Sequence, residues 1–122
     1  MYKRQLLKYL ASVLSENIYE ISDKERAILY VAAVFVNNFV NHLYQIGDTI
    51  TQKENLSFEI LKPLIQETML KIQNHAPADM QTGPAIRGDE NTIKKHLDYL
   101  EKYPQFAEIY KLISESINSG MN

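Results

Sequence analysis

Apolar residues recur with the spacing of amphipathic helices along most of the chain, and this pattern predicts five helices. In the first segment, for example, Leu6 and Leu10 share one side while Lys3 and Lys8 fall on the other. Clusters of Asn, Ser, Gly and Pro separate the periodic segments. The predicted helices span residues 1–15, 23–53, 58–74, 89–102 and 104–119. We interpret residues 18–21 as an extended connector, because no other segment could pair with them as a strand.

The segment 23–53 is the longest predicted helix. Ser22 or Asp23 followed by Glu25 is typical of a helix start, because a capping oxygen and early acidic residues favour the free N–H groups there. Residues 27–36 are apolar on every side, so we expect them to run through the centre of the fold. The sequence therefore predicts an all-α fold, a helical bundle around one long central helix.

Length and composition favour one soluble domain over residues 1–122. The net charge of −2 argues against a nucleic-acid or acidic-membrane partner, because both need a basic surface. The absence of cysteine excludes disulfides, thiolate catalysis and cysteine-based metal sites. The apolar run 27–36 is shorter than the roughly 20 residues that a bilayer needs, and no signal peptide precedes it, so we expect a cytoplasmic protein without membrane contact.

A polar stripe marks one side of the long helix. Its members are Asn37, Asn38, Asn41, His42 and Gln45, which fall within an arc of roughly 140° on an ideal helix, with Tyr30 and Asp48 in the same sector. Three asparagines in five positions weaken a helix, and binding a polar ligand would offset that cost. The alternatives are a stripe that faces water or one that forms hydrogen bonds between helices. The lack of Lys and Glu favours a binding role, and His42 is the candidate for proton transfer.

Residues 76–89 form the one long irregular stretch, and such loops are often functional. Gly83 allows a close approach of backbone to a ligand, and Arg87 could hold a carboxylate or a phosphate. The simpler interpretation is a loop fixed by an Arg87–Asp89 pair and a helix cap at Asp89. The glycine-rich dinucleotide and phosphate signatures are both absent. His96 could reach a ligand bound there, although a half-exposed helix histidine is the common case, and no histidine has metal-ligand spacing.

Together these residues resemble a known family. The resemblance rests on residues 32–44 (AAVFVNNFVNHLY), 61–68 (LKPLIQET) and 81–89 (QTGPAIRGD), followed by Thr92 and His96. The chain is similar over nearly its whole length to the C-terminal half of a bacterial group of predicted NAD(P)-dependent oxidoreductases, catalogued as domain of unknown function 2520 (DUF2520). The segment Thr-Gly-Pro-Ala-x-Arg-x-Asp is its most specific part.

The resemblance implies a fold like the C-terminal domain of the 6-phosphogluconate dehydrogenase superfamily, which includes ketopantoate and pyrroline-carboxylate reductases. In those enzymes the helical domain dimerises and closes a substrate cleft over the nicotinamide. It implies no cofactor in this domain, NAD or NADP in the parent protein, and three partners: a second copy, an N-terminal Rossmann domain and a small-molecule substrate. The implied substrate-binding residues are Asn37, Asn38, Asn41 and His42 on one wall, and Thr82, Gly83, Arg87, Asp89 and His96 on the other.

The chain departs from the family of dehydrogenases in two respects. The dinucleotide-binding half is absent, so the chain corresponds to an excised domain that is not catalytic alone. The catalytic Lys-x-x-x-Asn of the hydroxyacid dehydrogenases and ketopantoate reductases is also absent, since Val34 lies four residues before Asn38 and Ala33 four before Asn37. The catalytic residue is therefore unknown, and His42 or a tyrosine would have to move the proton.

Two other functions remain open. The chain could be a non-catalytic interaction module in which the polar stripe forms a hydrogen-bond network at a homodimer interface. It could also be a small-molecule sensor without redox chemistry.

Overall fold

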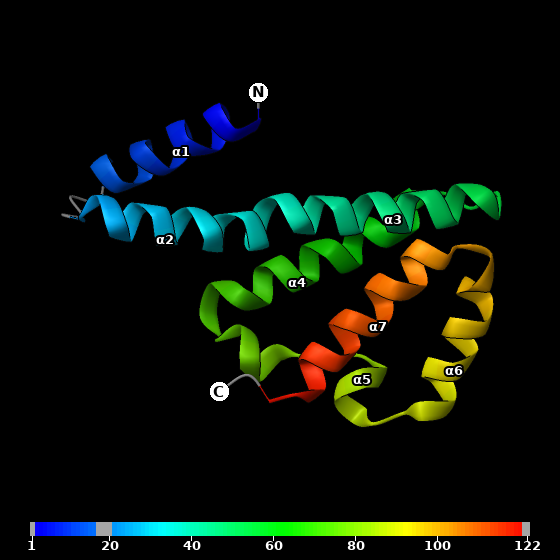
Figure 1. Cartoon of the computed structure of the whole chain (residues 1–122). Helices are drawn as coiled ribbons and strands as arrows, with labels where there is room; N and C mark the ends of the chain where they lie inside the picture. The colour runs from blue at the N-terminus through cyan, green and yellow to red at the C-terminus, as the bar shows by residue number, and fades with distance from the viewer. Residues whose placement is uncertain (1, 17–20, 121–122) are drawn as a thin grey trace. The chain divides into compact units, whose positions relative to one another are not determined.

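All regular structure in the residues that the computed structural model describes, 2–16 and 21–120, is helical (Figure 1). The all-α prediction is therefore confirmed. The chain divides into two compact units, Met1–Ser57 and Phe58–Asn122, and each is considered by itself. The expectation that residues 1–122 act as one domain stays a prediction.

The first unit contains the long helix. Its elements are α1 (Tyr2–Glu16), α2 (Asp23–Ala33), the π-helical turn η1 (Val34–Phe39) and α3 (Val40–Lys53). The last three are continuous, so the predicted helix 23–53 is confirmed. It begins with a capping box: the Glu25 backbone N–H donates to Ser22 Oγ at 3.1 Å, and the Ser22 N–H donates to Glu25 Oε1 at 3.2 Å. Ser22 is thus the N-cap of α2. The predicted connector at 18–21 lies outside the described residues, except for Ile21.

The long helix is not buried as its sequence predicted. Of the stretch 27–36 only Ala33 is buried, whereas Val31 is 59%, Phe35 61% and Val36 75% exposed. An all-apolar helix buries only the sides that meet another element, and apolar content alone does not say how many sides do. The prediction that 27–36 forms the centre of the fold is therefore wrong for this chain, which instead presents an apolar helix surface.

The helix Asp23–Lys53 is also long and apolar enough to cross a bilayer, judged by length and composition alone. Its apolar stretch is longer than the run 27–36 considered above, but core helices of soluble proteins pass the same test. The polar stripe argues against a bilayer, because amides and an imidazole at the centre of a span are costly.

The second unit contains the segments that carry the remaining predicted site residues. In order they are η2 (Phe58–Leu61), α4 (Lys62–Asn74), η3 (Pro77–Met80), α5 (Pro84–Arg87), α6 (Glu90–Tyr99), η4 (Leu100–Lys102) and α7 (Pro104–Asn118). The helix predicted from residue 58 starts as a 3₁₀ turn, and α4 proper begins after Leu61 with Pro63 in its first turn. Proline lacks an N–H, so it is tolerated there. The N-cap of α4 is Leu61.

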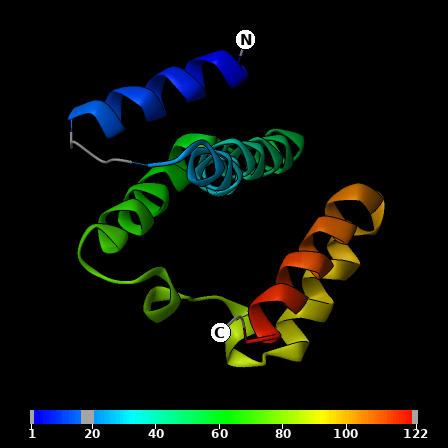
Figure 2. The same ribbon diagram turned by 60° about the vertical axis from the view of Figure 1, so that its left-hand side comes forward.

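The prediction that residues 76–89 form one irregular loop is wrong, because this segment contains the short helices η3 and α5. Both start at a proline, whose fixed φ favours a helical first residue. After them α6 and α7 lie side by side, joined through η4, and α5 contacts both (Figures 1 and 2). Leu100 at the corner and Ala85 of α5 are the buried residues of this unit.

Candidate functional site

The predicted site residues fall into two groups, one in each compact unit. Asn37 and Asn38 belong to η1, and Asn41 and His42 belong to the first turn of α3. The other five lie in the second unit, from Thr82 to His96 of α6. Each group is described on its own unit.

The polar stripe coincides with the π-helical turn. A π turn places one extra residue in the helix relative to α geometry, which rotates everything before it by about 100° relative to everything after it. The predicted sector is unaffected for Asn41, His42 and Gln45, because α3 is regular. Tyr30 lies before the π turn, so its place in that sector stays a prediction. No residue type in Val-Phe-Val-Asn-Asn-Phe distinguishes a π turn from an α turn, so the sequence analysis did not find it.

The stripe is accessible in this chain except at Asn38. Asn37, Asn41 and His42 are exposed, whereas Asn38 is half-buried. The Asn38 Oδ1 atom is buried and has no hydrogen-bond partner in the described part of the chain. Buried amide oxygens are nearly always paired, and π turns concentrate at functional sites. The two observations together single out Asn38 within the stripe.

Two glycines with positive φ shape the segment around α5. Gly83, its N-cap, has φ +103° and ψ 170°, a conformation that is essentially restricted to glycine. Gly88, its C-cap, is left-handed at φ +65° and ψ 29°. Between them Pro84 starts the turn, and the buried methyl group of Ala85 anchors it. Thr82 lies just before the turn, is exposed, and accepts a hydrogen bond at its carbonyl from Gln81 Nε2 at 3.0 Å.

Asp89 is the N-cap of α6, as predicted. Its Oδ1 accepts from the Thr92 backbone N–H at 3.1 Å, and its Oδ2 accepts from the Thr92 hydroxyl at 2.7 Å. These hydrogen bonds, the side-chain one first, hold the pKa of Asp89 below its ordinary value, with smaller help from Arg87 and Lys95 and some opposition from burial. The carboxylate is therefore committed to the helix start.

Arg87 is paired with Asp89 only loosely. Arg87 Nη2 lies 3.9 Å from Asp89 Oδ2, which is beyond hydrogen-bond length, and the Arg87 side chain is 60% exposed. The predicted Arg–Asp pair is thus present, but it is of the exposed kind that contributes little to stability. Most of the guanidinium donors remain directed at solvent and available to an anion.

His96 is joined to a tyrosine of the next helix. Its Nδ1 lies 2.8 Å from the hydroxyl of Tyr110 on α7, and the two rings meet edge to face at 5.7 Å between centroids. The His96 side chain is exposed and Tyr110 is half-buried, which raises the pKa of the Tyr110 phenol. The sequence does not indicate this partner, which lies 14 residues away on the next helix. Other aromatic rings nearby also pack: the Tyr103 ring centroid is 6.2 Å from that of Tyr99, and the Tyr103 ring stacks on Phe106 at 5.6 Å.

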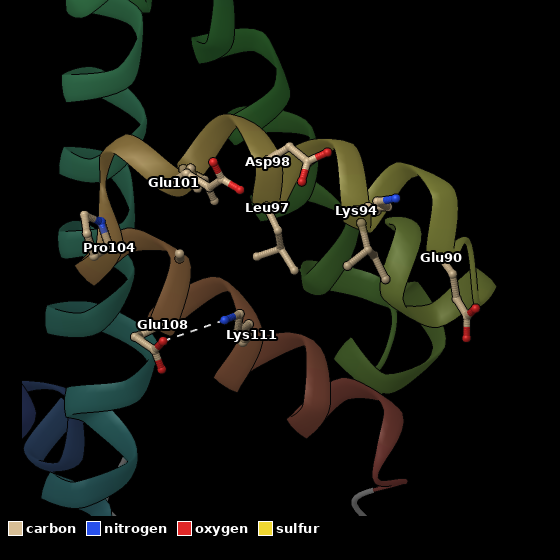
Figure 3. Close-up of a pocket in the computed structure, with 11 residues that line it drawn as sticks. Glu90, Lys94, Leu97, Asp98, Glu101, Pro104, Glu108 and Lys111 are labelled. Carbon is tan, nitrogen blue, oxygen red and sulfur yellow. Dashed lines mark ion pairs between the residues drawn. The ribbon is translucent and has the colours of Figure 1, made fainter.

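A groove runs between α6 and α7, with Leu97 extending from α6 toward α7 (Figure 3). It has a volume of about 550 Å³, an apolar floor and charged edges, where Lys111 and Glu108 lie 3.8 Å apart. Its lining residues are Glu90, Ile93, Lys94, Leu97, Asp98, Leu100, Glu101, Pro104, Ala107, Glu108 and Lys111. None of the nine predicted site residues lines it, so the groove lends no support to them. Within the described residues no group of three His, Asp or Glu side chains could hold a metal ion.

Comparison with known proteins relates the chain to one family. The family model described as "Domain of unknown function (DUF2520)" matches residues 2–117. Among solved structures, the chain is similar to the crystal structure of a "putative NADP oxidoreductase" from Bacteroides fragilis, with 42% sequence identity and a TM-score of 0.80. That match covers 83% of this chain and 39% of the other, so this chain corresponds to about two fifths of that protein's length. No curated protein matches the chain at a significant level.

Proposed function

This chain belongs to the DUF2520 family, and from that premise we propose that it is the substrate-binding and dimerisation domain of an NADP-dependent oxidoreductase. The observation that carries the proposal is the 42% identity to a protein named an NADP oxidoreductase, over 83% of this chain. At that identity the two chains share a fold and a common origin. The match accounts for 39% of the other chain, so the domain would serve the parent protein's chemistry without performing it alone.

In this proposal the cofactor is held by another part of the parent protein. The chain contains no Gly-x-Gly-x-x-Gly segment, so it does not supply a Rossmann-type pyrophosphate site itself. When bound, the reduced cofactor supplies the hydride. We propose NADP and not NAD, because the similar solved structure is named a "putative NADP oxidoreductase". The residues of this chain bind and orient the substrate and handle its proton.

The segment around α5 and the start of α6 would bind the anionic end of a small substrate. The exposed guanidinium N–H groups of Arg87 can form two parallel hydrogen bonds to a carboxylate. The 3.9 Å contact with Asp89 is too long for a hydrogen bond, so it leaves these donors available. Gly83 lets the backbone approach the ligand, and Thr82 and His96 add exposed polar groups on the same unit. Asp89 acts indirectly, by holding the start of α6.

The polar stripe would bind the rest of the substrate. Asn37 and Asn41 offer amide donors and acceptors, and His42 is the candidate proton donor to a carbonyl or imine group. The buried Oδ1 of Asn38, which has no partner in the described part of the chain, would accept a hydrogen bond from the substrate. The catalytic lysine of the hydroxyacid dehydrogenases and ketopantoate reductases has no counterpart here, so His42 or a tyrosine would have to move the proton.

The test is NADPH oxidation by the parent protein with a panel of small carbonyl and imine compounds that carry a carboxylate. We expect turnover with at least one of them. Arg87→Ala should then raise KM by about 10- to 100-fold, because hydrogen bonds to a charged group contribute roughly 1.5–3 kcal/mol. Arg26→Ala, which removes an exposed arginine from α2, is the matched control and should leave KM unchanged. Equal kinetic constants for the two variants would contradict the assignment of Arg87 to the substrate site. A parent protein without NADPH oxidation would contradict the proposed oxidoreductase activity.

A second candidate function is a non-catalytic homodimerisation module, and one observation favours it. The exposed apolar side chains of the long helix, Val31, Phe35 and Val36 among them, need a partner whether or not the parent is an enzyme. We propose that a second copy of the chain covers these side chains. We also propose, as the sequence led us to expect, that the protein is cytoplasmic. An inactive parent that still dimerises would favour this candidate.

A further inference from the structure

The contact between His96 and Tyr110 has a chemical consequence that the proposed function leaves open. The two side chains come from different helices, α6 and α7, and their polar atoms approach to 2.8 Å. The ring of His96 is exposed, so its second nitrogen, Nε2, is the polar atom left for a ligand. Whether Nε2 donates or accepts a hydrogen bond depends on which nitrogen carries the proton, and that is decided at Nδ1.

The acid–base properties of the two groups decide the direction of their hydrogen bond. The imidazole nitrogen is a far stronger base than the phenol oxygen, and the phenol O–H is the more acidic donor. Half-burial of Tyr110 raises its pKa further, so the phenol keeps its proton at physiological pH. If the Tyr110 hydroxyl donates to His96 Nδ1, the proton of the neutral imidazole sits on Nε2.

We propose that Tyr110 is a positioning residue that fixes His96 as the Nε2–H tautomer, so that His96 binds an acceptor oxygen of the ligand, a carbonyl or carboxylate. The edge-to-face ring contact holds the imidazole plane at 88° to the phenol and restricts its rotation. A ligand that offers only N–H donors at this point would find no acceptor. This inference rests on the proposed role of His96 in substrate binding and narrows the substrate to a class.

The geometry of α6 places this donor beside the other polar groups of the unit. Thr92 lies one turn before His96 on the same side of the helix, and its hydroxyl is already committed to Asp89 at 2.7 Å. The Nε2–H group is thus one side-chain donor that this side of α6 keeps for a ligand. Sequence alone could not show it, because its partner lies 14 residues away on the next helix.

The tautomer can be measured directly by nitrogen NMR of the 122-residue chain with labelled histidine, at a pH where the imidazoles are neutral. In the wild type we expect His96 to show a protonated Nε2 and an unprotonated, hydrogen-bonded Nδ1. Tyr110→Phe should remove the hydrogen-bond shift at Nδ1, while the resonances of His42 and His75 stay in place. Tyr103→Phe, a tyrosine stacked on Phe106, is the matched control and should change none of them.

Two small probes test the ligand class in the same spectra. Pyruvate, which offers carbonyl and carboxylate oxygens, should shift the His96 Nε2–H resonance of the wild type and shift it less in Tyr110→Phe. Methylammonium, which offers only donors, should shift it in neither. A protonated Nδ1 in the wild type, an unchanged Nδ1 in Tyr110→Phe, or no response to pyruvate would each overturn the inference. None of these readouts needs NADPH turnover, so a failure of the proposed oxidoreductase would be seen separately.

Discussion

Backbone conformation at single residues controls the segment that carries Arg87. Gly83 and Gly88 bracket α5 with positive φ, and an added Cβ would meet no other atom within 4 Å at either position. The cost of substituting them is therefore conformational and not steric. Their conformations also differ: Gly88 is in the left-handed helical region that Asn tolerates, whereas Gly83 is in a region almost exclusive to glycine.

Replacing Gly88 should therefore be mild and should depend on the residue introduced. We expect Gly88→Ala to lower the free energy of unfolding by about 1–2 kcal/mol, the usual cost of a left-handed non-glycine residue. Gly88→Asn should cost less, and Gly83→Ala should cost more than either. Urea unfolding of the three variants measures this order. An equal loss for all three would mean that α5 does not hold these conformations in solution.

The titration of Asp89 predicts a dependence of stability on pH. Its folded pKa lies below the ordinary value of 3.8, so its contribution is present above that value and is lost as the pH falls through the folded pKa. Asp89→Asn keeps a capping side chain but cannot titrate. We expect the variant to be less stable than the wild type at neutral pH, with the gap closing in acid below 3.8. A gap that stays constant with pH, in thermal unfolding, would contradict the role of the carboxylate.

At the scale of elements, the long helix combines a strong start with an irregular middle. The capping box at Ser22 satisfies free N–H groups of α2, and the 3.6-residue repeat continues as far as Ala33. The π turn then rotates α3 relative to α2 by about 100°. The polar stripe begins within that turn and continues into α3, whereas the exposed Val31, Phe35 and Val36 lie within or before it, so the π turn affects the angle between these two sets of side chains.

The capping box is the part of this helix most open to a simple test. Ser22→Ala should lower the free energy of unfolding by about 1 kcal/mol, because it leaves the Glu25 N–H without its partner. Lys24→Ala, in the same first turn but outside the box, should change stability by less than about 0.5 kcal/mol. Chemical denaturation followed by circular dichroism compares the two. If both substitutions had the same small effect, the capping box would be absent in solution.

At the scale of the whole molecule, the exposed apolar surface is larger than a lone soluble helix normally carries. Side chains such as Val31 at 59% and Phe35 at 61% exposure are not compensated within the described chain. Burial of each in a partner contributes about 1.5–3 kcal/mol, which is enough to drive association. A second copy, the rest of the parent protein and a lipid bilayer are the surfaces that could cover them.

Self-association decides among these partners. We expect the chain to sediment as a dimer, and Val31→Glu or Phe35→Glu to raise its dissociation constant by at least about tenfold, because a charge would replace the buried apolar contact. Arg26→Glu, an exposed position that helical spacing places on the opposite side of α2 from Val31 and Phe35, is the control. A wild type that stays monomeric in solution but binds neutral lipid vesicles would contradict the dimer and favour a membrane surface.

The sequence by itself determined the longer helices and several of their ends. Periodicity, capping residues and prolines act over three or four residues, so the start at Ser22, the cap at Asp89 and the final helix from Pro104 could be predicted without any tertiary contact. Residues 81–89, with the long-helix pattern, also carried the family resemblance that the family match confirmed. The roles of the individual site residues stay predictions.

Only the tertiary structure decided the features that depend on packing between elements. The exposure of residues 27–36 depends on how much of the helix surface its own chain can cover, which apolar content does not reveal. The π turn depends on a small difference between two hydrogen-bond patterns that no residue type marks. The bond between His96 and Tyr110 needs α6 and α7 to lie side by side, and that pairing brings together residues that no local pattern connects.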